Sequence, residues 1–542
     1  MSTQSIEHGR PPIDEPEGVH PAVQPSPDIQ RSQPTSQPLD AATIERLGRE
    51  RPPCFSSIWT ELAFCFSIIM CQVLAEYYIS GSNVLLPTLI EEMNIPPALS
   101  IWPSTALSLA VTSTLLIFGR LADMYGGFIM YIGGMVWLTT TSLIAGFSQS
   151  WMMLFVFRGL QGLGLASFLP SSIMILGSVY RPGPRKNLVF SVYGACAALG
   201  FFAGIFFSGI AGSFLNWRWY FYIGSILSAV TALSSYFSIP NDYAATRAST
   251  KATMDWIGCA LLVPGVVLFV FAIADSAHAP QQWRTPYILV CLILGAIILG
   301  VFVYVEGWVV DKPLLPGDLF SVKYMKPLII CLLLMYGSLG IFLLYAALYM
   351  ESIMGATPLQ VVAWTTPMAV GGLIISATGG FILHSLNGTL LMILSGLGYL
   401  GSGLLFAVLP RGGNYWAFVF PSMICGTIGI DISFNVTNIF ITTNMPQQRQ
   451  GLAGALINCT LHMGIAVMLA FADLIQVYTE EYLDTKGSYQ AAFWFQVGLS
   501  GLALVLVALF VRIDRAKSDL TVDEKRRLQL EQEGVLKGSE QY

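Results

Sequence analysis

The sequence predicts an all-α membrane protein that crosses the bilayer about fourteen times. Of its 542 residues, 54% are hydrophobic and only 11% are charged, whereas a soluble domain carries about 25% charged residues. The mean hydropathy of +0.64 agrees with this composition. Apolar segments recur at roughly the 20 residues that a membrane-spanning helix requires. The chain is therefore expected to be embedded in a lipid bilayer, and its net charge of −5 gives no electrostatic footprint for nucleic acid.

The apolar segments fall into groups of six, two and six. Before them, residues 1–57 are rich in Pro, Ser, Gln and Glu and poor in aromatics, so we expect a disordered cytosolic tail. The predicted units that follow are residues 58–240 with six spans, 241–326 with two inserted spans and a loop, 327–512 with six spans, and a tail at 513–542. The expected spans are 61–88, 100–118, 128–147, 152–178, 188–212, 218–239, 256–275, 286–306, 327–350, 360–383, 389–409, 415–441, 451–475 and 491–512.

Basic residues in the loops predict the orientation, because cytosolic loops carry an excess of Lys and Arg. With the N-terminal tail in the cytosol, the inner loops are the basic ones, and an even number of spans places both termini in the cytosol. The inner loops hold Arg120, Arg181, Arg185, Lys186, Arg247, Lys251, Lys312, Lys323, Lys326 and Arg449. The outer loops hold Arg218, Arg284, Arg411 and Lys486.

A short polar turn at 118–127 separates the second and third spans. Gly119 and Gly126 let the backbone turn sharply, and Arg120 lies between them. Asp123 precedes the next apolar segment, where a carboxylate can cap exposed N–H groups or face the positive end of a helix, including one in the other half of the protein. The turn resembles the G-x-L-A-D-x-x-G signature of the major facilitator superfamily. We expect these four residues to act in conformational gating.

The fourth span carries an arginine, which is costly inside a bilayer and normally faces a cavity or an acidic partner. This is Arg158, and Gln161 lies one turn further on the same face. The pair resembles the superfamily's R-x-x-Q-G signature, whose arginine is linked to proton transfer.

Glycines recur in the fifth span at Gly194, Gly200 and Gly204, and glycines of this kind allow close helix contact. The segment resembles the antiporter signature G-x-x-x-G-P-x-x-G-G, although Phe201 stands at the position of its proline. The resemblance favours antiport over uptake.

Several longer strings together resemble the fungal aminotriazole-resistance-type transporters of the fourteen-spanner drug:proton antiporter family. The strings are 158–170, 175–187, 254–258, 313–316, 429–434 and 450–458. The resemblance implies the major facilitator fold, with two six-helix bundles, two extra helices and alternating access around a central cavity. It also implies a monomer in the plasma membrane or the vacuolar membrane, which exports a small molecule and uses the proton gradient in place of any cofactor.

Acids inside the spans are candidates for proton coupling, because an unpaired charge at that depth costs several kcal/mol and favours a protonated state or a partner. We place this role on Glu76 and Asp431, together with Arg158 and Gln161. A structural alternative for Asp431 is hydrogen bonding to Ser433 or Asn435. The candidates for lining the central cavity are Tyr77, Tyr78, Asn83, Asn435 and His462.

Two other functions stay open at this point. Relatives of this type are associated with aminotriazole export, borate export or low-affinity ammonium transport, so the chain could instead be a facilitator of a small polar solute. A transporter-like nutrient receptor is the other alternative. An enzyme is not expected, because the sequence shows no nucleophile elbow, phosphate loop or metal-spaced His/Cys cluster.

Overall fold

The computed structural model describes residues 41–542 apart from 97–98, 100–101, 242–252, 277–278, 280, 311–312, 316, 318–319, 321, 447–448, 516–521, 523 and 526–542. The predicted tail at 1–57 and the C-terminal tail at 513–542 therefore fall largely outside the described residues. The side chains of some helical residues, Asn83 among them, are also outside the description.

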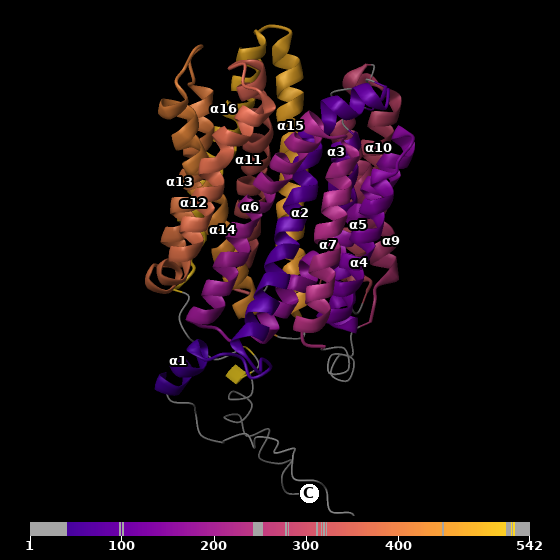
Figure 1. The fold of residues 1–542 in the computed structure, drawn as a ribbon. Coiled ribbons are helices and arrows are strands. Elements are labelled where there is room, and N and C mark those ends of the chain that lie inside the picture. Colours follow the sequence, from indigo (N-terminus) through magenta and orange to yellow (C-terminus); the bar gives the residue numbers. More distant parts are fainter. Residues whose placement is uncertain are drawn as a thin grey trace, which may run out of the picture. The chain divides into compact units, whose positions relative to one another are not determined.

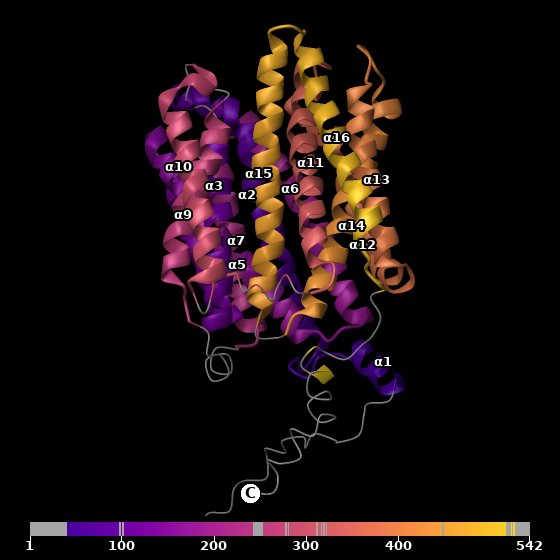
Figure 2. The same cartoon turned by 180° about the vertical axis from the view of Figure 1, so that it is seen from behind.

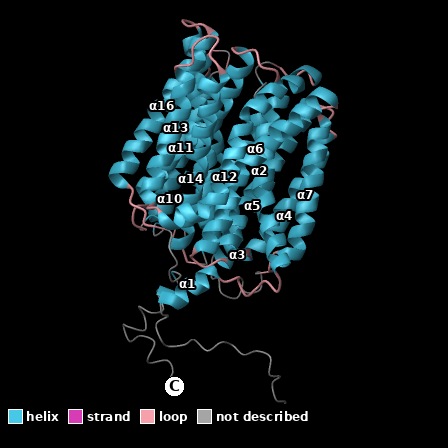
Figure 3. Cartoon of the chain, turned by 60° about the vertical axis from the view of Figure 1, so that its left-hand side comes forward, coloured by secondary structure: helices cyan, strands magenta, loops and turns pink. Residues whose placement is uncertain are grey.

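Fourteen α-helices of at least 20 residues run through the described part of the chain (Figure 1). The helices are α1 (Ala41–Arg49), α2 (Ile58–Glu92), α3 (Trp102–Tyr125), α4 (Gly127–Gly146), α5 (Trp151–Val179), α6 (Pro184–Phe214), α7 (Arg218–Ser238), α9 (Trp256–Ser276), η2 (Gln282–Arg284), α10 (Pro286–Trp308), α11 (Met325–Ser352), α12 (Pro358–Ser385), α13 (Gly388–Ala407), η4 (Tyr415–Val419), α14 (Phe420–Asn444), α15 (Gln450–Glu480) and α16 (Thr485–Phe510). Figure 3 shows helices joined by loops throughout this part. Thirteen of the helices are long and apolar enough to cross a membrane, and α12 adds a shorter apolar stretch. The predicted all-α fold of about fourteen spans is confirmed.

The helices extend beyond the predicted spans because polar residues cap them outside the apolar runs. The first span was expected at 61–88, but α2 already begins at Ile58. The Ser57 hydroxyl accepts a hydrogen bond from the Trp59 N–H at 3.3 Å, and the Thr60 hydroxyl accepts one from the Ser57 N–H at 3.2 Å. This reciprocal capping fixes the start of the helix.

Part of the predicted disordered tail is instead the short helix α1. Arg185 in the first turn of α6 donates a hydrogen bond to the Arg49 carbonyl at 3.1 Å, and Gly183, which precedes α6, lies against Gly48. These contacts with the turn between α5 and α6 hold a segment whose own composition does not predict a helix.

Two groups of six helices meet along two seams. In the first seam, α3 and α5 pack against α15, and in the second, α6 packs against α12 and α14. The inserted helices α9 and α10 pack on each other, and α9 also contacts α3 and α15 (Figure 2). We call the end of the helices at which α1 lies the α1 end, and the opposite end the far end (Figure 1).

Candidate functional site

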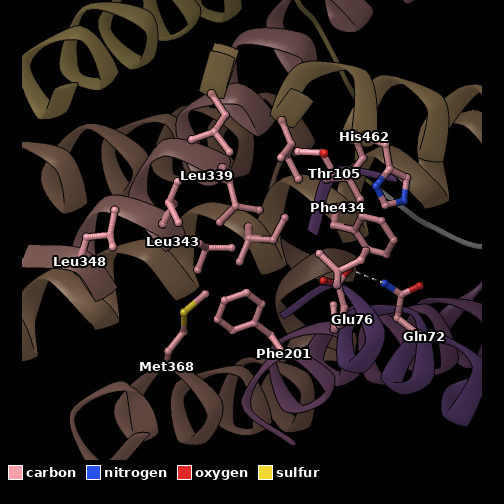
Figure 4. Close-up of a pocket in the computed structure, with 18 of the residues that line it drawn as sticks. Gln72, Glu76, Thr105, Phe201, Leu339, Leu343, Leu348, Met368, Phe434 and His462 are labelled. Atoms are coloured by element: carbon pink, nitrogen blue, oxygen red, sulfur yellow. Dashed lines mark hydrogen bonds between the residues drawn. The ribbon is translucent and has the colours of Figure 1, made fainter. Parts of the chain in front are cut away.

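A central cavity of about 320 Å³ lies between the two groups of six helices (Figure 4). Its wall is mostly apolar, and its polar side chains are few. They are Gln72, Glu76, Thr105, Glu351 and His462. The apolar ones include Phe201, Leu339, Leu343, Met368 and Phe434. Since Leu86 lies within the last two turns of α2 and Glu351 in the last turn of α11, the cavity reaches from the middle of the helices towards the far end.

Glu76, the acid predicted to take part in proton coupling, contributes a carboxyl group to the wall of the central cavity. Its one hydrogen bond to a described residue is long: the Gln72 side-chain amide donates to Oε1 over 3.4 Å (Figure 4). The amide oxygen of Gln72 is buried without a partner among the described residues. Glu76 is therefore weakly held and faces the space that a cargo molecule would occupy.

Asp431 lies one layer behind the cavity and has no hydrogen-bond partner among the described residues at either carboxyl oxygen. It is 0% exposed, and its neighbours Ile430 and Phe434 line the cavity while it does not. The predicted alternative partner Ser433 donates instead to the Gly429 carbonyl, at 2.8 Å. A bare charge in this place costs several kcal/mol, which makes Asp431 suited to holding a proton.

His462 also lines the central cavity. It is 5% exposed, and Figure 4 shows its ring beside Thr105. The ring makes no hydrogen bond to the described part of the chain, so its two nitrogen atoms are available to a ligand.

Three of the other predicted cavity residues do not line the cavity. Tyr77 and Tyr220 exchange hydrogen bonds between each hydroxyl and the other's carbonyl, both at 2.7 Å, and their rings stack at 4.8 Å. Tyr78 is also fully buried. Successive residues are 100° apart around a helix. When Glu76 and Ile79 face the cavity, Tyr77 and Tyr78 therefore point into the interior of the first bundle.

Asn435 is the third of these residues, and it packs against α6 next to Gly194 rather than lining the cavity. Its neighbour Phe434 takes the position in the wall. The side chain of Asn83, the remaining candidate, lies outside the described residues.

Arg158 is the centre of a buried polar network in the first bundle, and it is 1% exposed. Its guanidinium donates to the Pro103 carbonyl at 2.8 Å, the Gln161 amide oxygen at 3.0 Å, the Tyr78 carbonyl at 3.0 Å and the Ser82 hydroxyl at 2.8 Å. The Gln161 amide nitrogen donates in turn to the Ser142 hydroxyl at 3.1 Å. The network thus ties α2, α3, α4 and α5 together, without an acidic partner in it.

Asp123 crosses between the two halves at the α1 end. Its carboxylate accepts hydrogen bonds from the Gly451 N–H at 2.8 Å and the Leu452 N–H at 3.0 Å. These are N–H groups of the first turn of α15, whose N-cap residue Arg449 provides no side-chain cap. Asp123 therefore caps a helix of the other half, and the charge also faces the positive end of that helix.

Small residues make this crossing possible. Gly119 lies against Gly451 and Ala455, and a Cβ at Gly454 would come within 2.7 Å of the Pro170 carbonyl oxygen. Gly126 begins α4 with φ of 93°, a conformation that favours glycine. The glycine contacts between α3, α5 and α15 hold the two halves close together at the α1 end of the first seam.

Arg120 lies close enough to Asp123 for their charges to attract, and it also contacts a segment outside that crossing. Its guanidinium donates to the Thr253 carbonyl at 3.4 Å, so it contacts the segment that leads into the inserted helix α9. Among the described residues no hydrogen bond joins Arg120 to Asp123, and the role of Arg120 in gating stays a prediction.

The predicted glycine helix, α6, has two different neighbours. Gly200 and Gly204 lie against the α2 backbone at Val73 and Tyr77, and Gly194 lies against Asn435 of α14. The first two bring helices of one bundle together, and the third allows close approach between the bundles.

Sequence reasoning missed Gln72, Thr105, Phe201 and Glu351 as cavity residues. Gln72 carried a usable signal, because it lies one turn before Glu76 and so on the same helix face. The others come from different helices, and only the packing of the halves brings them together.

Comparison with known proteins agrees with this architecture. Residues 68–470 match the Major Facilitator Superfamily. The chain is 30% identical to the efflux pump terJ of Aspergillus terreus, over 88% of this chain and 93% of terJ. It is 34% identical to the low affinity ammonium transporter of Saccharomyces cerevisiae, over 78% of this chain and 83% of that protein.

Two further matches bear on the resemblance and the fold. The aminotriazole resistance protein of Saccharomyces cerevisiae is 28% identical over 85% of this chain and 86% of that protein. The solved proton:xylose symporter XylE superposes with a TM-score of 0.60 at 12% identity, covering 86% of this chain and 98% of XylE. With its fourteen long helices and its match over 68–470, the chain belongs to the major facilitator superfamily and is a multi-pass membrane transporter.

Proposed function

We propose that this transporter exports a small molecule in exchange for protons, by alternating access of the central cavity. The observation that carries the proposal is the cavity itself: it lies between the halves, which contact each other at the α1 end, and it holds the weakly bonded carboxyl of Glu76 in its wall. Asp431 adds an unpartnered acid behind the wall, from the other half of the protein. Acids inside transporter bundles commonly carry protons.

The proposed orientation places the α1 end in the cytosol, because the basic loop residues gather there. In this conformation the cavity then approaches the outer surface while the cytosolic side is closed. We further propose the plasma membrane as the site of action, with the vacuolar membrane as the alternative, and a monomer as the working unit.

A proteoliposome experiment tests the direction and the coupling. Purified protein is reconstituted, and transport of radiolabelled aminotriazole is measured with and without an imposed pH gradient. We expect movement of aminotriazole against its own gradient, opposite to the proton flow. Uptake in the direction of proton flow, or transport indifferent to the pH gradient, would contradict proton-coupled export.

The alternative of a facilitator for a small polar cation is supported by the 34% identity to the low affinity ammonium transporter. The same vesicles distinguish it when they are given radiolabelled methylammonium. Methylammonium flux that follows only its own gradient, together with no active aminotriazole movement, favours this second function.

A further inference from the structure

A second cavity of about 220 Å³ adjoins the central cavity on the side of the inserted helices, and we call it the side chamber. Helices α3, α9 and α15 provide most of its wall. The two cavities share six lining residues and are therefore direct neighbours. The shared residues are Ile79, Thr105, Leu344, His462, Ile465 and Leu469.

The side chamber exists because α9 is present. Its outer wall consists of residues from the second half of α9, including Phe271, Ala274 and Asp275. Phe271 also packs against Trp102 of α3, with ring centroids 5.5 Å apart. Without α9, this side of α3 and α15 would face lipid, so the inserted helix encloses a space that the two bundles alone leave open.

The charges around this space have one sign. Asp275 and Asp473 line the side chamber, and Glu76 and Glu351 line the central cavity, while the described residues around both include no Lys or Arg. Asp275 is buried and accepts a hydrogen bond from the Tyr287 hydroxyl at 2.8 Å. Asp473 lies within hydrogen-bonding reach of Tyr345. Other side chains thus hold both carboxyl groups in place.

A third polar group points to a ligand independently of the acids. His462 belongs to the shared wall, is only 5% exposed, and has no hydrogen-bond partner among the described residues. The imidazole ring can donate one hydrogen bond and accept another, and it offers both to a ligand in the adjoining cavities. A ligand that spans the two cavities would pass directly beside this ring.

We infer that the side chamber binds the positively charged part of an amphipathic organic cation, whose apolar body occupies the central cavity. Asp275 and Asp473 supply the opposite charge, and Trp102 and Phe271 offer ring faces that attract cations. This inference rests on the proposed function, because the bound cation would be one class of exported molecule, beside small solutes such as aminotriazole. It assigns the charge class of the cargo and gives the inserted helix a role in binding it.

The test uses two probes of the same shape and opposite charge, tetraphenylphosphonium and tetraphenylborate. Binding of each radiolabelled ion to purified full-length protein in nanodiscs is measured without any gradient. The wild type should bind the phosphonium at least about tenfold more tightly, because a nearby opposite charge in a partly buried site contributes more than that factor. Equal or tighter binding of the borate, or no binding of the phosphonium, would overturn the inference.

Two variants locate the site. Ala274→Trp fills the side chamber, and Ala260→Trp is its matched control on an exposed position of α9. Asp473→Asn removes one charge while keeping the side-chain size. We expect phosphonium affinity to fall about tenfold or more in Ala274→Trp and Asp473→Asn and to stay at the wild-type value in Ala260→Trp.

Unchanged phosphonium binding in both chamber variants would refute the role of the side chamber. Melting temperature and gel filtration identify a variant that is misfolded, and the isosteric Asp473→Asn change keeps the test valid if the Trp variant fails to fold. Binding is measured without a gradient, so a loss of phosphonium binding counts against the side chamber and not against proton-coupled export. If the proposed function were wrong, phosphonium would still bind but no proton-coupled transport would be measured.

Discussion

Replacing Asp123 by Asn should open the α1 end of the transporter. In the present conformation the carboxylate accepts two N–H groups of α15, at 2.8 and 3.0 Å, and is 1% exposed. An Asn side chain keeps one acceptor oxygen but turns an NH₂ group towards the second N–H. The variant therefore loses one hydrogen bond to a charged group and the interaction of the charge with the helix end.

The size of the effect follows from these two losses. A hydrogen bond to a charged group contributes about 1.5–3 kcal/mol, and a charge at a helix terminus contributes about 0.3–2 kcal/mol. Their combined loss of about 2–5 kcal/mol acts on the closed state alone, because the contact joins the two halves. At about 1.4 kcal/mol per factor of ten, the equilibrium between closed and open should move by about 30-fold or more.

Distance measurement by double electron–electron resonance can detect this change. Spin labels at Leu188 and Leu386, both exposed at the α1 end, report on the separation of the halves. The exposed Cys54 is replaced beforehand. Asp123→Asn should increase the population with the longer distance and reduce transport at normal expression.

Asp484→Asn is the matched control for this experiment. Asp484 also caps a helix, accepting the Gly487 N–H at 3.0 Å, but at the far end and within one half. Its replacement should leave the distances at the α1 end unchanged. Wild-type distances and wild-type transport in a well-expressed Asp123→Asn protein would refute the gating role.

Two further substitutions test other contacts. Gly454→Ala places a methyl group against the Pro170 carbonyl oxygen and Ile173, so it should also favour the conformation that is open at the α1 end. A cysteine introduced at Ile173 should then react faster with a thiol label. An unchanged labelling rate would show that the helices accommodate the methyl group without separating. Arg158→Lys keeps the charge but cannot reproduce the four hydrogen bonds to residues of α2, α3 and α5. We expect a lower melting temperature and at least about a tenfold loss of transport, because about one or two of these bonds are lost. Normal transport by the Lys variant would mean that only the positive charge of Arg158 matters.

The helices could be predicted from the sequence, but which side of each helix lines the cavity could not. Apolar runs of spanning length identify the spans, since length and composition suffice for that. Most of these helices are apolar all round, so the sequence gives no stripe that distinguishes cavity from bundle interior. For this reason Glu76 was visible as an acid in an apolar span, while Tyr77 and Tyr78 were wrongly assigned to the cavity.

Contacts between distant segments needed the structure. The position of Asp123 in its turn predicted a helix cap or a contact with a helix end in the other half, and its carboxylate does cap the first turn of α15. The side chamber had no local signal: Asp275, His462 and Asp473 lie on helices far apart in the chain. Only the packing of the inserted helix α9 against α3 and α15 brings them around one space.

The most direct test of the central claim measures proton movement driven by the exported molecule. Proteoliposomes containing a pH-sensitive dye receive aminotriazole, and wild-type protein is compared with Glu76→Gln, Asp431→Asn and the exposed control Glu480→Gln. The account predicts aminotriazole-driven proton movement for the wild type and the control. Glu76→Gln and Asp431→Asn should each still bind aminotriazole but lose export driven by the pH gradient. Normal gradient-driven export by both variants would contradict the account, because the coupling acids would then lie elsewhere or no proton would be coupled.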